Sequence, residues 1–192
     1  MMSGIRFLAA ALFASVVVPG PVPAPAQPPE LRLDGFPVLT RTAEARRVAL
    51  LGQVDLYSIA IYADGSIRDI AQLATDDRAK AVRIQVKYDS QYDPGMRPRI
   101  ALDWGHELVP SMSAAAFVTL RGAFAPLRGG DVVLVAYAPR KGTTVRINQS
   151  VVVVGSADHD LMLSFLDHWL GQTVLSEDVK DTLLDQISRT AR

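Results

Sequence analysis

The chain has 192 residues, carries no formal net charge at pH 7 and contains no cysteine. The balanced charge argues against a nucleic-acid binder, which usually shows a basic excess or a basic patch. The missing cysteines exclude disulfides, a thiolate nucleophile and a cysteine metal site, so the fold must rest on an apolar core, for which 49% hydrophobic residues supply the material.

The first 26 residues have the pattern of a secretory signal peptide. Arg6 supplies a positive start, residues 7–18 form an apolar run, and a small-x-small cleavage site ends at Ala26. The run is shorter than the roughly 20 apolar residues that a membrane span needs. We therefore expect cleavage after Ala26, a periplasmic or secreted protein with no stable membrane span, and a single domain over 27–192. An uncut N-terminal anchor is the alternative.

Extended segments dominate the first half of the domain, after a Pro-rich leader at 27–30. Residues 31–41 predict a first strand that a glycine and a proline interrupt. Residues 47–63 predict a long extended segment with a bulge or turn at Gly52. Residues 81–88 alternate between apolar and polar side chains, which predicts a strand with one solvated face.

The stretch VDLYSIAIYAD at 54–64 is apolar on both faces of the expected strand. Because successive side chains of a strand point to opposite faces, Tyr57 belongs to one face and Tyr62 to the other. A central strand has this composition when helices cover its second face. Between such a sheet and its helices we expect either solid core or a pocket.

Helices are predicted in the middle of the chain. A short helix at 66–74 begins with Ser66 as its cap. Two further helices follow the strand at 81–88, one with Pro98 in its first turn and running through Trp104, the other at 111–125.

The last third predicts a hairpin and two closing helices. Strands at 131–138 and 143–155 are joined across a short turn. An apolar stripe predicts a helix at 158–171 with Asp158 as its cap, and another at 176–187 with Ser176 as its cap. Strands and helices are segregated along the chain, which is typical of the α+β class, with a large antiparallel sheet covered by a layer of helices.

The familiar catalytic and nucleotide-binding motifs are absent from the sequence. Asp103, His106 and Glu107 could share one helix face and hold a metal, but a solvated helix end is the simpler interpretation. We expect neither a metal nor a cofactor.

A few polar residues stand among apolar neighbours and are candidates for a site. A tyrosine in this setting is usually a core residue with its hydroxyl bonded at the rim, and an arginine is usually a surface charge. The candidates are Arg47, Tyr57, Tyr62, Tyr92, Arg99 and Asn148.

The spacing of these residues resembles that of a chalcone isomerase-like domain of the exported bacterial kind. The resemblance extends from about Leu31 to Ile187 and lies in four segments that occur in the family's order. They are RRVALLGQVDLYSIAIYAD, QYDPGMRPRIALDW, AFVTLRGAFAPLRGGDVVLVAYAPRKGTTVRIN and FLDHWLGQTVLSEDVKDTLL. The resemblance implies an open-faced β-sandwich, in which a large antiparallel sheet is covered by a layer of helices.

Two of the family's five site positions keep their residue type in this sequence. The family's arginine falls at Arg47, with Arg46 as the alternative, and its catalytic tyrosine falls at Tyr92. Three positions differ: a threonine is replaced by Tyr57, an asparagine by Arg99, and a hydroxyl residue of the last helix by a residue at or near Val179.

These replacements argue against ring closure of the chalcone isomerase type, which needs donors already aimed at the reacting oxygen. Arg47, Tyr57, Tyr92 and Arg99 would instead suit an anion with an apolar tail, because a guanidinium grips a carboxylate with two hydrogen bonds. The resemblance thus favours a non-catalytic binder of a small apolar acid, such as a fatty acid. The alternatives are an envelope domain that binds a protein partner without ligand, and an isomerase that uses Arg47 and Tyr92.

Overall fold

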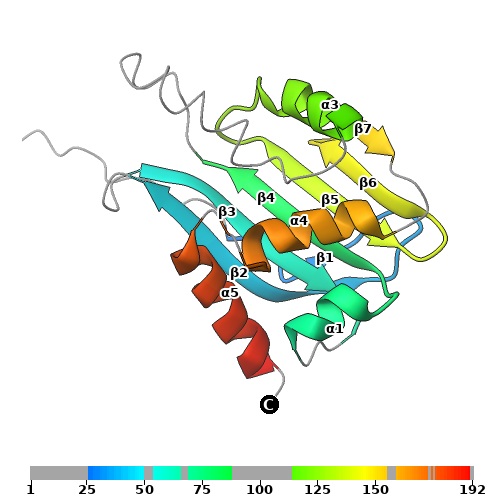
Figure 1. Ribbon diagram of the computed structural model, residues 1–192, viewed down its shortest axis with the longest axis vertical. Coiled ribbons are helices and arrows are strands. Elements are labelled where there is room, and N and C mark those ends of the chain that lie inside the picture. The colour runs from blue at the N-terminus through cyan, green and yellow to red at the C-terminus, as the bar shows by residue number, and fades with distance from the viewer. Residues whose placement is uncertain are drawn as a thin grey trace, which may run out of the picture.

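The computed structural model describes residues 26–49, 54–65, 69–87, 114–154, 159–172, 174 and 176–190. Within these residues one sheet of seven strands has the same order in space as in the chain, and each neighbouring pair is antiparallel (Figure 1). This arrangement confirms the expected large antiparallel sheet. The strands are β1 (Glu30–Leu31), β2 (Leu39–Ala49), β3 (Val54–Ala63), β4 (Lys80–Val86), β5 (Val132–Ala138), β6 (Gly142–Ile147) and β7 (Ser150–Val154).

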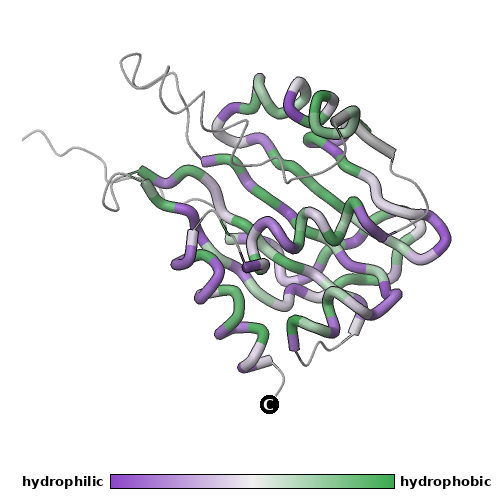
Figure 2. Tube along the Cα trace, in the orientation of Figure 1, coloured by the Kyte–Doolittle hydropathy of each residue, from purple (hydrophilic) through white to green (hydrophobic). Residues whose placement is uncertain are grey.

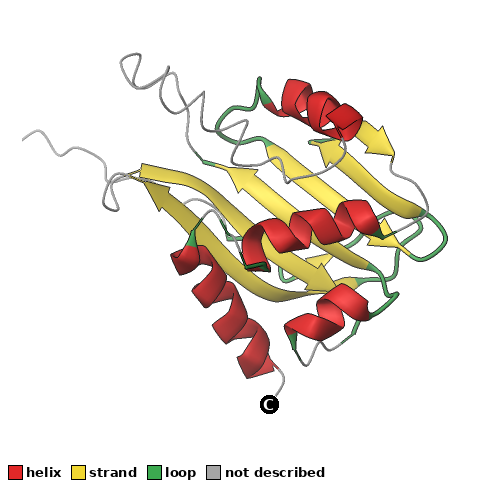
Figure 3. Cartoon of the chain, viewed as in Figure 1, coloured by secondary structure: helices red, strands yellow, loops and turns green. Residues whose placement is uncertain are grey.

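The described helices lie on one side of the sheet, which confirms the α+β class with a helical layer (Figure 3). Helix α4 crosses the middle of the sheet, and α5 runs beside β2, as Figure 1 shows. Among the described residues, no helix is both long and apolar enough to cross a membrane. The helices are α1 (Ile70–Thr75), α3 (Ala114–Phe124), α4 (Asp160–Leu170) and α5 (Glu177–Thr190).

The two faces of β3 enter two different apolar clusters. Tyr57 and Ile59 belong to the cluster between the sheet and the helices, where α4 contributes Phe165. Ala60 and Tyr62 belong to a second cluster on the opposite face of the sheet. The predicted separation of the two tyrosines onto opposite faces is therefore confirmed.

A segment at the N-terminus, residues 26–38, covers the second face of the sheet; we call it the N-terminal strap. Leu31, Leu33 and Phe36 of the strap pack against the second cluster, and the blue end of the chain runs behind the sheet in Figure 1. Helices thus cover one face of β3, as expected, and the strap covers the other. The leader at 27–30 is part of the packed fold, because Gln27 is only 2% exposed.

Two predicted extended segments each contain parts of two strands. Residues 47–63 hold the end of β2 and all of β3, which pair as an antiparallel hairpin. Residues 143–155 hold β6 and β7, because Asn148 adopts a left-handed φ of 56° and reverses the chain. Asparagine tolerates this conformation better than most residues, so a two-residue turn forms there. The Asn148 amide N–H donates to the carbonyl of Val132 at 2.7 Å and fixes the turn.

The helix boundaries agree in part with the sequence. Helix α1 begins at Ile70, where Asp69 Oδ1 accepts from the Gln72 amide at 2.8 Å and acts as the cap. Ser176 caps α5 as predicted, accepting from the Val179 amide at 3.5 Å. The predicted caps Ser66 and Asp158, and the predicted helix from Pro98 through Trp104, lie outside the described residues.

Helix α5 closes the outer edge of β2. Strand β1 pairs with β2 only at Leu39 and Thr40, so the following residues of β2 have no described strand on their outer side. At Glu44 the side-chain amide of Gln186 takes the place of a strand. It donates to the Glu44 carbonyl at 2.7 Å and accepts from the Glu44 amide at 2.9 Å.

Candidate functional site

Arg47 and Tyr57 stand side by side on adjacent strands, where they are direct cross-strand partners of β2 and β3. Directly opposed residues of an antiparallel pair project to the same face of the sheet. Tyr57 is 1% exposed and lies in the cluster beneath the helices. Its hydroxyl accepts a hydrogen bond from Nε1 of Trp169 in α4 at 3.2 Å. The sheet thus brings two of the four predicted binding residues together under the helical layer.

The neighbouring Arg46 points to the other face of the sheet. Its side chain is 58% exposed and forms an ion pair with Asp55. Arg47 has a buried Nε atom, and its guanidinium donates to the carbonyl of Val48 at 3.3 Å, next to a register shift in the β2–β3 ladder. The geometry therefore places Arg47, and not Arg46, beside Tyr57.

The other two predicted binding residues, Tyr92 and Arg99, lie outside the described residues, as do Asp103, His106 and Glu107. Their roles stay predictions. Within the described residues, no three side chains of His, Cys, Asp or Glu come close enough together to hold a metal ion.

Val179, at or near which the resemblance implied a hydroxyl position, is 1% exposed and belongs to the core beneath α5. It contributes apolar surface to the helix-facing cluster. The nearby hydroxyl of Ser176 is used as the cap of α5.

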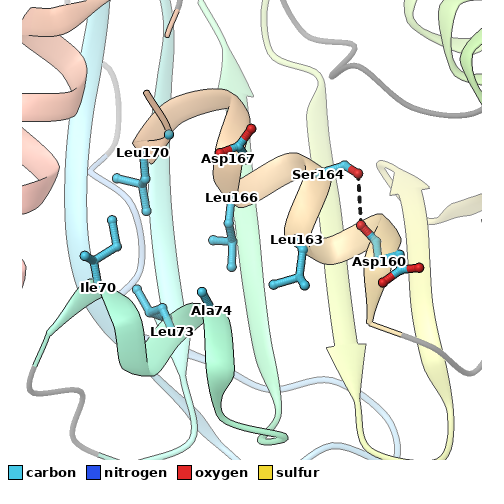
Figure 4. A pocket seen from close by; sticks show the side chains of 10 residues that line it. Ile70, Leu73, Ala74, Asp160, Leu163, Ser164, Leu166, Asp167 and Leu170 are labelled. Atoms are coloured by element: carbon cyan, nitrogen blue, oxygen red, sulfur yellow. Dashed lines mark hydrogen bonds between the residues drawn. The ribbon is translucent and has the colours of Figure 1, made fainter. Parts of the chain in front are cut away.

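A groove of about 530 Å³ runs between α1 and α4 on the outer side of the helical layer (Figure 4). Its apolar walls come from both helices, while Asp160, Ser164 and Asp167 of α4 supply polar groups. The apolar side chains that line it are Ile70, Leu73, Ala74, Leu163, Leu166 and Leu170. The volume falls in the range of small-ligand pockets, about 300–1,000 Å³. The groove could not be predicted from the sequence, because it depends on two helices that lie far apart in the chain.

Lys80 is a buried cation that sequence analysis also missed. It is 1% exposed, and its ammonium donates to the carbonyls of Leu73 and Asp76 at the end of α1, the second at 2.8 Å. Burial lowers the pKa of Lys80 to about 8. The alternation of β4 contained the signal, since Lys80 has the same parity as the inward-facing Val82 and Ile84.

Polar groups around Lys80 line one end of the helix-facing core. The Lys80 ammonium lies 6.0 Å from the centre of the Tyr137 ring, and the Tyr137 hydroxyl donates to Asp77. The ring of His159 stacks on Tyr137 with 4.3 Å between centroids. Burial, together with the nearby Lys80 charge, lowers the pKa of His159. These contacts tie the start of α4 and the end of α1 to the sheet.

Gln27 is the polar anchor of the N-terminal strap on the opposite face. Its side-chain amide donates to the Ser58 hydroxyl at 2.9 Å and to the Ser58 carbonyl at 3.3 Å. Its side-chain oxygen accepts from the guanidinium of Arg83, and its backbone carbonyl accepts from Arg41 at 2.5 Å. The expected solvated face of β4 is thus partly covered, and burial lowers the pKa of Arg83.

Tyr62 is held by the same strap. Its hydroxyl donates to the carbonyl of Pro28 at 2.9 Å. Burial raises the pKa of Tyr62 to about 12, although the nearby guanidinium groups of Arg83 and Arg41 act in the opposite direction. Tyr62 is therefore a neutral structural donor, and its hydroxyl is not directed toward the helix-facing site.

Comparison with known proteins adds a similar structure and no relative in sequence. No family model and no curated protein matches the sequence. Solved structures of similar shape include the crystal structure of a fatty-acid binding protein from Arabidopsis thaliana. It has a TM-score of 0.47 and 17% sequence identity, with 80% of this chain and 90% of that chain covered.

Proposed function

We propose that the protein is a non-catalytic binder of a small apolar acid, such as a fatty acid, whose carboxylate is held by Arg47 and Tyr57. The observation that carries the proposal is the cross-strand pairing of Arg47 with the buried Tyr57 under the helical layer. The resemblance of the sequence to chalcone isomerase-like domains, some of which bind fatty acids without catalysis, supports the same role.

The chemistry of the pair suits a carboxylate. Arginine presents a planar fork of N–H groups that matches the two oxygens of a carboxylate. The Tyr57 hydroxyl, which accepts from Trp169, adds a second polar group beside the guanidinium. An alkyl tail that entered beside the pair would meet apolar core side chains, among them Ile59 and Phe165.

Binding of dodecanoate tests the proposal. We expect native mass spectrometry of the purified protein to show one added dodecanoate, and a titration to show that Arg47→Gln weakens this binding about tenfold or more. A hydrogen bond to a charged group contributes about 1.5–3 kcal/mol, and 1.4 kcal/mol corresponds to a factor of ten.

Arg46→Gln is the matched control, because it removes the same charge from the adjacent position on the opposite face. Tyr57→Phe removes only the hydroxyl and is expected to weaken binding by a smaller factor. Equal loss of affinity in the Arg46 and Arg47 variants, or no uptake of dodecanoate by the unaltered protein, would refute the proposal.

We also propose that the domain acts after export, in the periplasm or outside the cell. Cleavage after Ala26 is compatible with the packed fold, because it would leave every described hydrogen bond of the Gln27 side chain in place. N-terminal sequencing of the protein recovered from a periplasmic extract is expected to begin at Gln27. Recovery of the uncut chain from the cytoplasmic fraction alone would contradict export.

A further inference from the structure

The side-chain amide of Gln27 is buried and hydrogen-bonded at both of its ends. Gln27 is 2% exposed, and its Nε2 donates to the hydroxyl and the carbonyl of Ser58 in β3. Its Oε1 accepts from the guanidinium of Arg83 in β4, while its backbone carbonyl accepts from Arg41 of β2. The amide is therefore held between two strands of the sheet, and the backbone of the same residue is bonded from a third.

Gln27 is also the residue that the proposed cleavage after Ala26 places first in the chain. Cleavage converts its backbone nitrogen from an amide into a free α-amino group. The pKa of such a group is ordinarily about 7.7–8.0, so part of it is neutral and nucleophilic at neutral pH. In a chain that begins with glutamine, this nitrogen can attack Cδ of its own side chain and close a five-membered ring.

The reaction converts glutamine into pyroglutamate and needs no other reactant. A bond forms between the α-nitrogen and Cδ, and the bond between Cδ and Nε2 breaks. One proton passes from the amino group to Nε2, which leaves as ammonia, and nothing is oxidised or reduced. The product has lost the Nε2 donor and the basic amino group at the chain end.

We propose that Gln27 of the mature chain is a site of N-terminal cyclisation, that the docked strap blocks this reaction, and that cyclisation during an opening of the strap is irreversible and prevents normal docking. Ser58 and Arg83 hold the amide in place, so it cannot fold back onto its own backbone nitrogen while the strap is docked. Once Nε2 has left, both hydrogen bonds to Ser58 are lost, because that atom was their donor. The reaction thus turns a reversible opening into a permanent one.

The rate of cyclisation reports how firmly the strap is held. When the strap opens and closes faster than the ring forms, the rate follows the population of the open state. The inference rests on the cleavage after Ala26 that we propose above. It does not depend on dodecanoate binding, because Tyr57 and its cross-strand partner Arg47 face the helices, on the other side of the sheet.

Mass spectrometry of the intact mature protein, recovered from a periplasmic extract, tests the inference. The mass is expected to correspond to residues 27–192 with an uncyclised Gln27. In guanidinium chloride the protein is expected to lose the mass of one ammonia, and a peptide map to place this loss at Gln27. In buffer at the same pH the loss is expected to be at least about tenfold slower, a factor that corresponds to about 1.4 kcal/mol.

Two serine variants make the test specific. Ser58→Ala removes a hydroxyl that accepts from Gln27 and leaves the reacting groups unchanged. In buffer it is expected to cyclise about fivefold faster than the unaltered protein, the factor for one neutral hydrogen bond of about 1 kcal/mol. Ser164→Ala is the matched control, because its hydroxyl bonds within α4, and it is expected to cyclise at the unaltered rate.

The stability of the cyclised protein tests the consequence for the strap. Protein that has cyclised in guanidinium chloride and is then refolded is expected to unfold at a lower urea concentration than protein refolded at once. Its urea midpoint is expected to be close to that of Gln27→Ala, which lacks the same amide.

Several results would overturn the inference. They are equal rates of cyclisation in buffer and in guanidinium chloride, equal rates for the two serine variants, and a urea midpoint that cyclisation leaves unchanged. A mature chain that begins at another residue would overturn it together with the proposed cleavage, and would leave the dodecanoate titration unaffected. Absence of dodecanoate binding in a protein that cyclises as described would refute only the proposed binding function.

Discussion

Replacement of Gln27 by alanine is expected to loosen the N-terminal strap and destabilise the whole fold. The change removes the hydrogen bonds to Ser58 and leaves the guanidinium of Arg83 without its acceptor in Gln27. A neutral hydrogen bond contributes about 1 kcal/mol and one to a charged group about 1.5–3 kcal/mol. Because these terms are not additive, we expect the free energy of unfolding to fall by about 2–4 kcal/mol.

Urea denaturation followed by circular dichroism measures this loss. Domains are typically stable by about 5–15 kcal/mol, so a fall of this size moves the midpoint well beyond experimental error. Glu30→Ala is the matched control, because Glu30 lies in the same strap and its ion pair with Arg32 is exposed. A loss below about 1 kcal/mol for Gln27→Ala, or one equal to that of Glu30→Ala, would refute the idea that buried polar contacts hold the strap.

Three further predictions concern single side chains. Lys80→Met tests the buried cation. The pKa of Lys80 is about 8 in the folded protein and 10.5 ordinarily, so between these pH values the unfolded chain binds more protons than the folded one. The stability of the unaltered protein relative to the variant is therefore expected to rise with pH across this window, by up to about 3 kcal/mol in pH-dependent denaturation. Gln186→Ala removes the side-chain amide that bonds the Glu44 backbone at the edge of β2, and it is expected to lower the free energy of unfolding by about 1–3 kcal/mol in the same assay. A loss near zero would mean that water replaces the amide at Glu44. Gly122→Ala, in an open position of α3, is expected to stabilise the fold by about 0.5–1 kcal/mol. Gly171→Ala is expected to destabilise the fold, because a Cβ there would collide with the backbone of the last turn of α4. Thermal melting that shifted both variants in the same direction would contradict this contrast.

Periodic segments of the sequence predicted the fold well. The alternation at 81–88 and the apolar stripes at 158–171 and 176–187 correspond to β4, α4 and α5, because one face of each element is buried in a continuous core. The middle of β2, residues 42–46, was missed because its residues face different environments, including the helix-facing core and solvent. The end of β6 was missed because the chain reverses through the left-handed conformation of Asn148, and neither glycine nor proline marks this turn in the sequence.

The candidate site could be predicted only in part. Arg47 and Tyr57 were both named as site candidates, but their pairing depends on the β2–β3 register, which shifts between Arg47 and Val48. The buried polar residues Gln27 and Lys80 could not be predicted from their residue types, because such groups are buried only when tertiary contacts supply hydrogen-bond partners. The groove between α1 and α4 arises from helix packing, which no local pattern contains.

The two ends of the domain meet on one short part of β2, and this bears on the order in which the protein folds. Figure 2 shows the strands as a largely green meander, in which each strand pairs with the next one in the chain, so most of the sheet can form from contacts that are near in sequence. The closing contacts are different. Arg41 donates to the carbonyl of Gln27 and to the carboxylate of Glu44. The backbone amide of Glu44 in turn donates to the side chain of Gln186, 142 residues further along the chain. During synthesis the chain can therefore form its strand pairs early, but the edge of β2 at Glu44 is covered only after the last helix has been synthesised. Until then that edge remains open to pairing with another chain.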